Sequence, residues 1–271
     1  MSKKVRENIP IIKGIKVFDT HSHLNDEQFE GRVDEIIKEA SRYNVGHIAV
    51  PGYDLESSIK AVEIANSHEN IYAIVGIHPD DAENCSKEDL DTIRKLAKEN
   101  DKVVAIGEIG LDYYWHKEEK NHEKQKELFK KQIEIANELN LPIAIHTREA
   151  TLDTIEILKE NPAKHTGIIH CAPLNEHLIK EALKLGYYIS FSGVVTFKNA
   201  NPNESVRLVP DDKILVETDA PYLTPEPNRG KQNMPGYTYY TLRKVAEIRG
   251  EDLEEFSEKV FENSKRVYGI K

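Results

Sequence analysis

Two histidines spaced by one residue, His21 and His23, follow a short apolar run that ends at Asp19. In a β-strand alternate residues share one face, so both imidazoles are expected to point the same way. Two neutral imidazole nitrogens that converge on one point can bind a divalent metal ion. The pair is therefore a candidate half of a metal site, whose other ligands must come from elsewhere in the chain.

Histidines and carboxylates recur where later apolar runs of the chain end. These residues are His78, Glu108, His146, His170, Glu217 and Asp219. Leaving one buried polar group unpaired costs on the order of 1–3 kcal/mol, so repeating that cost on most strands of one sheet indicates a shared purpose. We expect this purpose to be a metal centre.

Four of the histidines and two of the carboxylates suffice for two divalent ions, if one carboxylate bridges them. Each ion would then keep open positions for water and substrate, as a catalytic centre requires. Glu108 is our candidate for the bridge, because its strand stands in the middle of the chain order. A metal lowers the pKa of a water ligand towards about 7, and we expect Asp219 to bind a metal and to accept that proton.

Other polar residues at the strand ends are expected to bind substrate or to support the ligands. Arg148 shares a strand face with His146, and its planar guanidinium suits an anionic substrate group, although a pair with Glu149 or another carboxylate would explain it equally well. His78 is expected to donate a hydrogen bond to the same anionic group. Glu217 is either a metal ligand or a residue that orients a neighbouring ligand, and we predict the orienting role.

Eight short apolar or β-branched runs alternate with segments of helical periodicity. The runs span 15–19, 45–50, 71–76, 102–106, 142–145, 167–169, 187–190 and 214–216. Continuous apolar runs are typical of strands buried on both faces of a parallel sheet. Even spacing without a glycine-rich phosphate loop favours an α/β fold of the (β/α)8 TIM type over a doubly wound sheet, and chemistry in such barrels lies at the carboxyl ends of the strands.

The chain is expected to form a single barrel domain over 15–271 after an N-terminal extension, 1–14. The helical segments are predicted at 34–43, 55–67, 87–99, 122–139, 152–158, 176–185 and 252–267. The turn-rich segment 221–237 follows the last strand and is expected to lie over the barrel mouth.

Composition limits the classes of partner. The 271 residues carry a net charge of −10, which argues against sequence-independent binding of nucleic acid over a broad surface. There are two cysteines, no signal-peptide pattern and no apolar run long enough to span a membrane. We therefore expect a cytoplasmic protein with reduced thiols, and a monomer.

Six motifs stand in order between about residue 16 and the C-terminus. They are Asp19-Thr-His21-Ser-His23, Gly76-Ile-His78-Pro79, Gly107-Glu108-Ile-Gly110-Leu-Asp112-Tyr113, His146-Thr-Arg148-Glu-Ala150, His170-Cys171 and Glu217-Thr-Asp219-Ala-Pro221. Each motif alone is a weak signal, but six in register resemble the TatD family of metal-dependent deoxyribonucleases, within the amidohydrolase superfamily. After His170-Cys171 the chain departs from many members of that family, so its loop there is expected to shape the choice of substrate.

The resemblance implies the role of each ligand. It implies that His21, His23 and Asp219 bind one metal, that Glu108 bridges, and that His146 and His170 bind the second. Asp19 takes a supporting place below the ligand layer. The implied cofactors are two divalent ions, magnesium or manganese, with zinc often present in purified protein.

The implied substrate is DNA, hydrolysed at phosphodiester bonds as a 3′ exonuclease. Together with the acidic composition, this suggests short or single-stranded ends as the partner. Tyr113, Tyr114 and Trp115 could stack on bases or wall the loop; we expect Tyr114 and Trp115 to form a wall and keep Tyr113 as a candidate substrate contact.

Two other functions stay open at this point. A related amidohydrolase-superfamily enzyme would act on another ester, amide or phosphoester, although many of those use a carboxylated lysine where this chain has Glu108. A non-catalytic metal-binding protein would be expected to have a broken ligand set, and this one is intact.

Overall fold

The computed structural model describes residues 14–271. The predicted extension, 1–14, therefore lies outside the described residues except for Gly14. None of the helices within 14–271 combines the length and apolar character that crossing a membrane requires.

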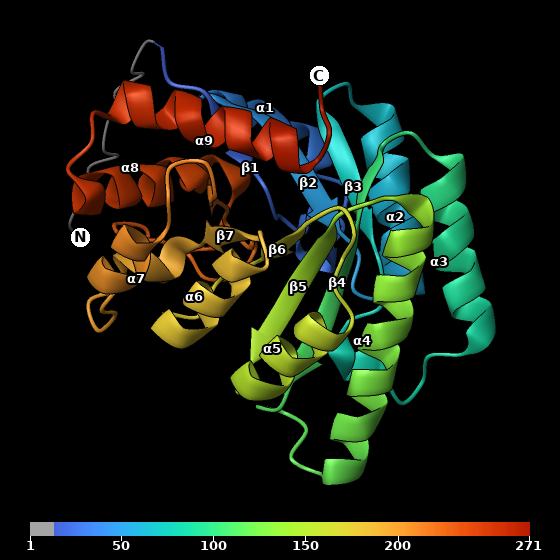
Figure 1. The fold of residues 1–271 in the computed structure, drawn as a ribbon. Helices are drawn as coiled ribbons and strands as arrows, with labels where there is room; N and C mark the ends of the chain where they lie inside the picture. Colours follow the sequence, from blue (N-terminus) through green and yellow to red (C-terminus); the bar gives the residue numbers. More distant parts are fainter. Residues whose placement is uncertain (1–13) are drawn as a thin grey trace.

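The described residues contain eight parallel strands whose order in the sheet is their order in the chain, which confirms the predicted TIM-type barrel (Figure 1). The strands are β1 (Val17–Asp19), β2 (Val45–Pro51), β3 (Ile71–Val75), β4 (Val103–Asp112), β5 (Ile143–Arg148), β6 (Gly167–Ile169), β7 (Tyr188–Phe191) and β8 (Ile214–Val216). Directly after β1, the backbone N–H and hydroxyl of Thr20 both donate to the carbonyl of Val216 in β8, at 3.4 and 3.0 Å. These bonds bring the two ends of the sheet together.

Helices surround the strands as an outer layer (Figure 1). They are α1 (Val33–Ser41), α2 (Leu55–Ser67), α3 (Lys87–Glu99), α4 (Glu119–Leu139), α5 (Thr151–Glu160), α6 (Glu176–Lys184), α7 (Asn203–Leu208), α8 (Thr238–Arg249) and α9 (Leu253–Val267). The sequence pattern predicted α2 and α3 with the bounds that the structure has. It missed α7, which is only six residues long, and α8, although the buried Tyr239, Leu242, Val245 and Ala246 of α8 have helical spacing.

Alternate side chains of each strand pack into two separate apolar layers. Phe18, Ile74 and Ile168 fill the barrel interior, whereas their neighbours Val17 and Ile169 pack between the sheet and the helices. Because both faces are covered, the strands are apolar throughout, as the sequence indicated.

β4 and β5 run six and three residues further than the sequence pattern predicted. β4 continues six residues past the predicted end at Ile106, and it pairs with β5 as far as Asp112 opposite Arg148. The apolar run stops earlier because Gly107 and Gly110 lie where β4 and β5 approach closely. A Cβ at Gly110, whose φ is +143°, would overlap the backbone oxygen of His146. Glu108 therefore lies within a strand and not in the loop that follows one.

Candidate active site

A cavity of about 780 Å³ opens at the carboxyl ends of the strands. Its lining includes His23, His78, Glu108, His146, His170 and Asp219. The turn-rich segment after β8 contributes Tyr222 and Leu223 to the same lining, as expected of a segment over the barrel mouth. Most of the residues predicted from separate strand ends thus meet in one place.

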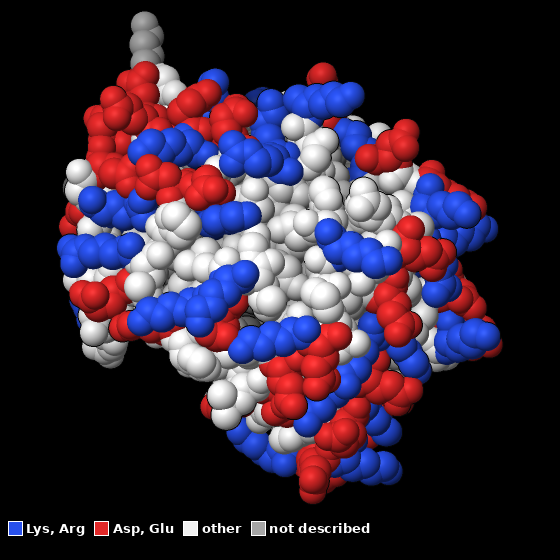
Figure 2. Space-filling model, viewed as in Figure 1, with Lys and Arg blue, Asp and Glu red and all other residues white. Residues whose placement is uncertain are grey.

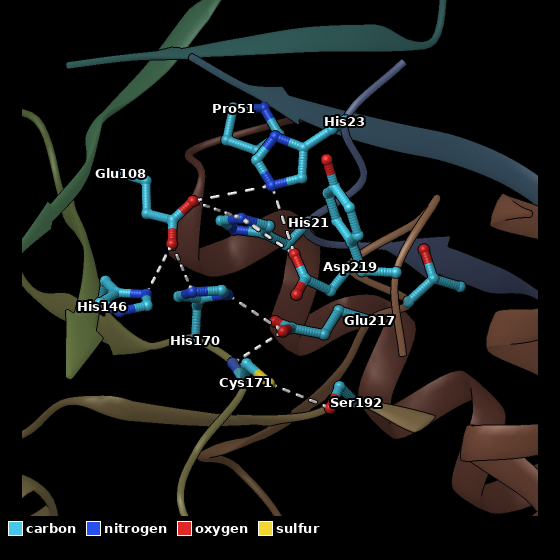
Figure 3. A network of polar contacts seen from close by, with 12 residues as sticks. His21, His23, Pro51, Glu108, His146, His170, Cys171, Ser192, Glu217 and Asp219 are labelled. Carbon is cyan, nitrogen blue, oxygen red and sulfur yellow. Dashed lines mark hydrogen bonds and ion pairs between the residues drawn. The ribbon is translucent and has the colours of Figure 1, made fainter. Parts of the chain in front are cut away.

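Glu108 lies at the centre of this cluster, with one carboxylate oxygen turned towards each of two histidine pairs (Figure 3). Oε1 lies 2.8 Å from Nδ1 of His146 and 2.8 Å from Nε2 of His170. Oε2 lies 3.2 Å from Nε2 of His21 and 3.7 Å from Nε2 of His23. This arrangement is the one that a carboxylate between two cations would need.

Asp219 faces the first histidine pair from the opposite side. Its Oδ1 lies 3.3 Å from Nε2 of His23 and 3.9 Å from Nε2 of His21. Its backbone adopts a left-handed conformation, with φ at +58°, which aspartate tolerates better than most residues. The Asp219 N–H donates to the carbonyl of His21 at 2.9 Å, so the turn is fixed relative to the histidine pair. The Asp219 side chain is 16% exposed, against 6% for Glu108, and so reaches the cavity more openly.

The donor atoms suit divalent metal ions. In the described part of the chain, three groups of ligand atoms lie within 4.8 Å of one another, namely His21–Glu108–His170, His21–His23–Asp219 and His78–Glu108–His146. Within residues 14–271, the buried Nδ1 atoms of His21 and His23 have no hydrogen-bond partner, so the polar contacts of both rings lie on the Nε2 side that faces the carboxylates. Buried imidazole nitrogen and carboxylate oxygen together fit zinc, manganese or magnesium.

Two further carboxylates lie behind His146 in β5 and His170, which directly follows β6. Oε1 of Glu217 lies 3.2 Å from Nδ1 of His170 and accepts the N–H of Cys171 at 2.7 Å (Figure 3). Oδ2 of Asp112 lies 2.9 Å from Nε2 of His146. A carboxylate behind a histidine ligand fixes the proton on the far nitrogen and leaves the near nitrogen free to bind metal.

Asp112 has no assigned role in the sequence-based ligand set. A signal was present, because Asp112 follows Glu108 by four residues on one strand, and alternation puts both on the same face. The predicted strand ended at residue 106, so this spacing carried no weight. Glu217 contacts the ring of His170, and its orienting role stays a prediction.

Asp19 is fully buried and accepts hydrogen bonds from neighbouring backbone and hydroxyl groups. Thr218 donates to it through its N–H at 2.9 Å and through its hydroxyl at 2.5 Å, and the N–H of His21 lies 3.4 Å away. Burial raises the pKa of Asp19 to about 8 despite these donors. Its contacts join β1 to the segment that carries Asp219.

The buried charges of the cluster shift one another's pKa values. Burial alone would raise the pKa of Glu108, but His170, His146 and His21 hold it well below its usual range. Burial would lower the pKa of His146, yet hydrogen bonds from its ring to the carboxylates of Asp112 and Glu108 raise it to about 9. The pKa of His21 is lowered by burial and by the nearby His170. The cluster keeps its central carboxylate ionised and favours positive charge beside it.

The predicted substrate contacts have different surroundings. Nε2 of His78 lies 3.6 Å from Oε1 of Glu108, within the cavity lining. Arg148 also lines the cavity and has no carboxylate partner within residues 14–271, because Glu149 pairs with Lys117 at 2.8 Å. The alternative pair of Arg148 with Glu149 is therefore wrong.

Tyr113 lies apart from the cavity lining. Its hydroxyl donates to Asp153 at 2.7 Å, and its ring stacks on His122 at 3.6 Å between centroids. Contact of Tyr113 with a substrate stays a prediction. The loop after His170 does reach the cavity through Ala172, Pro173 and Leu174.

Comparison with known proteins identifies relatives over nearly the whole chain. The family model described as "TatD related DNase" matches residues 18–269. An uncharacterized metal-dependent hydrolase of Bacillus subtilis, YabD, is 45% identical over 94% of this chain and 99% of its own length. A second one from Escherichia coli K12, YcfH, is 36% identical over 93% of this chain and 95% of its own length. The crystal structure of the E. coli TatD homologue YJJV superimposes with a TM-score of 0.89 at 26% identity, covering 95% of this chain and all of that one.

Proposed function

Because the chain belongs to the TatD-related DNase family of metal-dependent hydrolases, we propose that it is a deoxyribonuclease that removes nucleotides from the 3′ ends of DNA. The observation that carries this proposal is the position of Glu108, whose two oxygens face separate histidine pairs. Two adjacent divalent ions are a common arrangement in enzymes that hydrolyse phosphodiester bonds.

The proposed ligands divide into two sets around Glu108. His21, His23 and Asp219 would hold one ion, and His146 and His170 would hold the other, with magnesium or manganese as the proposed ions. When bound, the ions supply Lewis acidity and positive charge for the phosphate group.

The remaining steps are assigned to side chains of the chain itself. Asp219 accepts the proton of the attacking water on a carboxylate oxygen, since it is the more exposed of the two central carboxylates. Arg148, free of any carboxylate within the described residues, holds the phosphate through its guanidinium. His78 donates a hydrogen bond to the same group from the wall of the cavity.

The charge of the molecule supports a strand end as substrate in preference to a long duplex. The net charge is −10, and lysines and arginines are interspersed with acidic residues over the face drawn in Figure 2. Affinity for DNA should then depend only weakly on salt, because few phosphates are contacted outside the cavity. A steep fall of affinity with rising salt would contradict this part of the proposal.

The direct test is incubation of the metal-stripped protein with a 5′-labelled single strand, with and without added magnesium or manganese. We expect stepwise shortening from the 3′ end that needs the metal. The Glu108→Gln and Asp219→Asn variants should lose turnover while keeping the wild-type circular dichroism spectrum. Cleavage of another ester or amide in the absence of any DNA cleavage would refute the proposed substrate and leave the metal site standing.

A further inference from the structure

Two aromatic side chains lie exposed on the loop that joins β4 to α4. The side chain of Trp115 is 66% exposed and that of Tyr114 is 38% exposed, and their rings meet edge to face with centroids 4.6 Å apart. From the sequence we expected both rings to form a wall of the loop. Their exposure does not fit that role, because the half-buried Tyr113 already packs the loop against α4 through His122.

The aromatic pair is joined to the proposed metal centre through Asp112. Oδ1 of Asp112 accepts the backbone N–H of Tyr114 at 2.9 Å and lies 3.4 Å from that of Trp115. Oδ2 of the same carboxylate contacts His146. The loop backbone is thereby fixed relative to a proposed ligand of the centre, whereas the more exposed indole of Trp115 projects into solvent.

A cation also lies on this pair and faces the cavity. The guanidinium of Arg148 stacks 3.8 Å from the centroid of Tyr114 and 5.6 Å from that of Trp115. Such stacking holds a planar cation in place while its N–H groups stay free to bind an anion. Arg148 lines the cavity, so the aromatic pair is continuous with the proposed site of phosphodiester hydrolysis.

We propose that Trp115 and Tyr114, with Arg148 between them and the cavity, form a subsite that stacks an unpaired nucleobase of the substrate strand. The inference rests on the proposed function and adds a residue-level basis for binding single strands. Arg148 binds the backbone phosphate, and the base next to that phosphate lies on the indole of Trp115. Stacking on an aromatic ring needs a free base face, which a base inside a duplex does not offer.

Fluorescence gives a direct test, because Trp115 is the only tryptophan of the chain. The wild-type protein is mixed with an octathymidylate in stopped flow with magnesium, and separately with an abasic oligomer of the same length and charge. We expect rapid, saturable quenching by the octathymidylate and little by the abasic oligomer. Equal quenching by both, or none by either, would overturn the stacking proposal.

Kinetics supply the second measurement. Loss of one stacked base weakens binding by roughly 5-fold or more, so Trp115→Ala should raise KM for a single strand by that factor with kcat nearly unchanged. Trp115→Phe should retain most of the affinity. Ile59→Ala, which removes a 39% exposed apolar side chain on α2, is the control and should leave KM unchanged.

The outcomes separate the two proposals. Base-dependent quenching without any DNA cleavage by the wild-type protein would reject the nuclease function and keep the subsite. DNA cleavage with an unchanged KM in Trp115→Ala and no base-dependent quenching would keep the nuclease and reject the subsite. If Trp115 and Tyr114 bind a protein partner instead of a base, the experiment would give this second outcome.

Discussion

Replacing Asp112 with asparagine tests whether the carboxylate behind His146 controls metal binding. Asp112 contacts Nε2 of His146 at 2.9 Å, and Nδ1 of the same ring faces Glu108 at 2.8 Å. With Asp112 ionised, Nε2 carries the proton and Nδ1 keeps its lone pair for a metal. The pKa of Asp112 supports this ionised state. Burial would raise that pKa, but His146 and the loop amides hold it below the usual value for aspartate.

The asparagine variant cannot satisfy all of these partners at once. If its NH2 group faces Nε2, the imidazole proton moves to Nδ1 and blocks the metal-binding nitrogen. If its oxygen faces Nε2 instead, the N–H of Tyr114 loses its acceptor. Loss of a carboxylate that orients a ligand typically weakens metal binding by about 10–100-fold, or about 1.4–2.8 kcal/mol.

Calorimetric titration of the stripped variant with manganese measures this effect. We expect one of two binding events to weaken by about tenfold or more, and the metal concentration for half-maximal activity to rise in parallel. The melting temperature in EDTA should stay within about 4 °C of wild type, because the change removes no apolar packing. Two unchanged binding constants in a folded variant would refute the orienting role of Asp112.

Three other changes probe separate parts of the molecule. Arg148→Ala should raise KM for DNA by about tenfold or more, because a charged hydrogen bond to the phosphate is lost. The control Glu149→Ala should leave KM within about twofold, since Glu149 pairs with Lys117. Equal effects of the two changes would contradict a free guanidinium. Gly110→Ala should lower the melting temperature by about 4 °C or more, because Gly110 has a φ of +143° and the new Cβ would overlap the backbone of His146. An unchanged melting curve would reject this close approach. Two lysines lower the pKa of Glu181 from its ordinary 4.5 to about 2, so its stabilisation is present above pH 4.5 and is lost as the pH falls towards 2. The melting temperature of Glu181→Gln should therefore fall less than that of wild type between pH 5 and pH 2, and parallel curves would refute the ion pairs.

The barrel and the clustering of the histidines and carboxylates were predictable because both depend on short-range patterns. Apolar runs at even spacing define buried parallel strands, and polar residues directly after such runs fall on one edge of the sheet. This reasoning brought His21, His170 and Asp219 together correctly, although they lie far apart in the chain.

What was missed depends on tertiary contacts that periodicity does not contain. The extension of β4 to Asp112 depends on pairing with β5 across glycines, which a propensity pattern interprets as a strand end. The exposure of Trp115 depends on Tyr113 taking the packing position beside α4. Three consecutive aromatic residues do not indicate which of them will be buried.

Anomalous diffraction from crystals soaked in manganese would show directly whether Glu108 lies between two metal ions. We predict two anomalous peaks, one beside His21 and His23 and one beside His146 and His170, with Glu108 between them. A single peak, or peaks that leave the Glu108 carboxylate without a metal contact, would contradict the account.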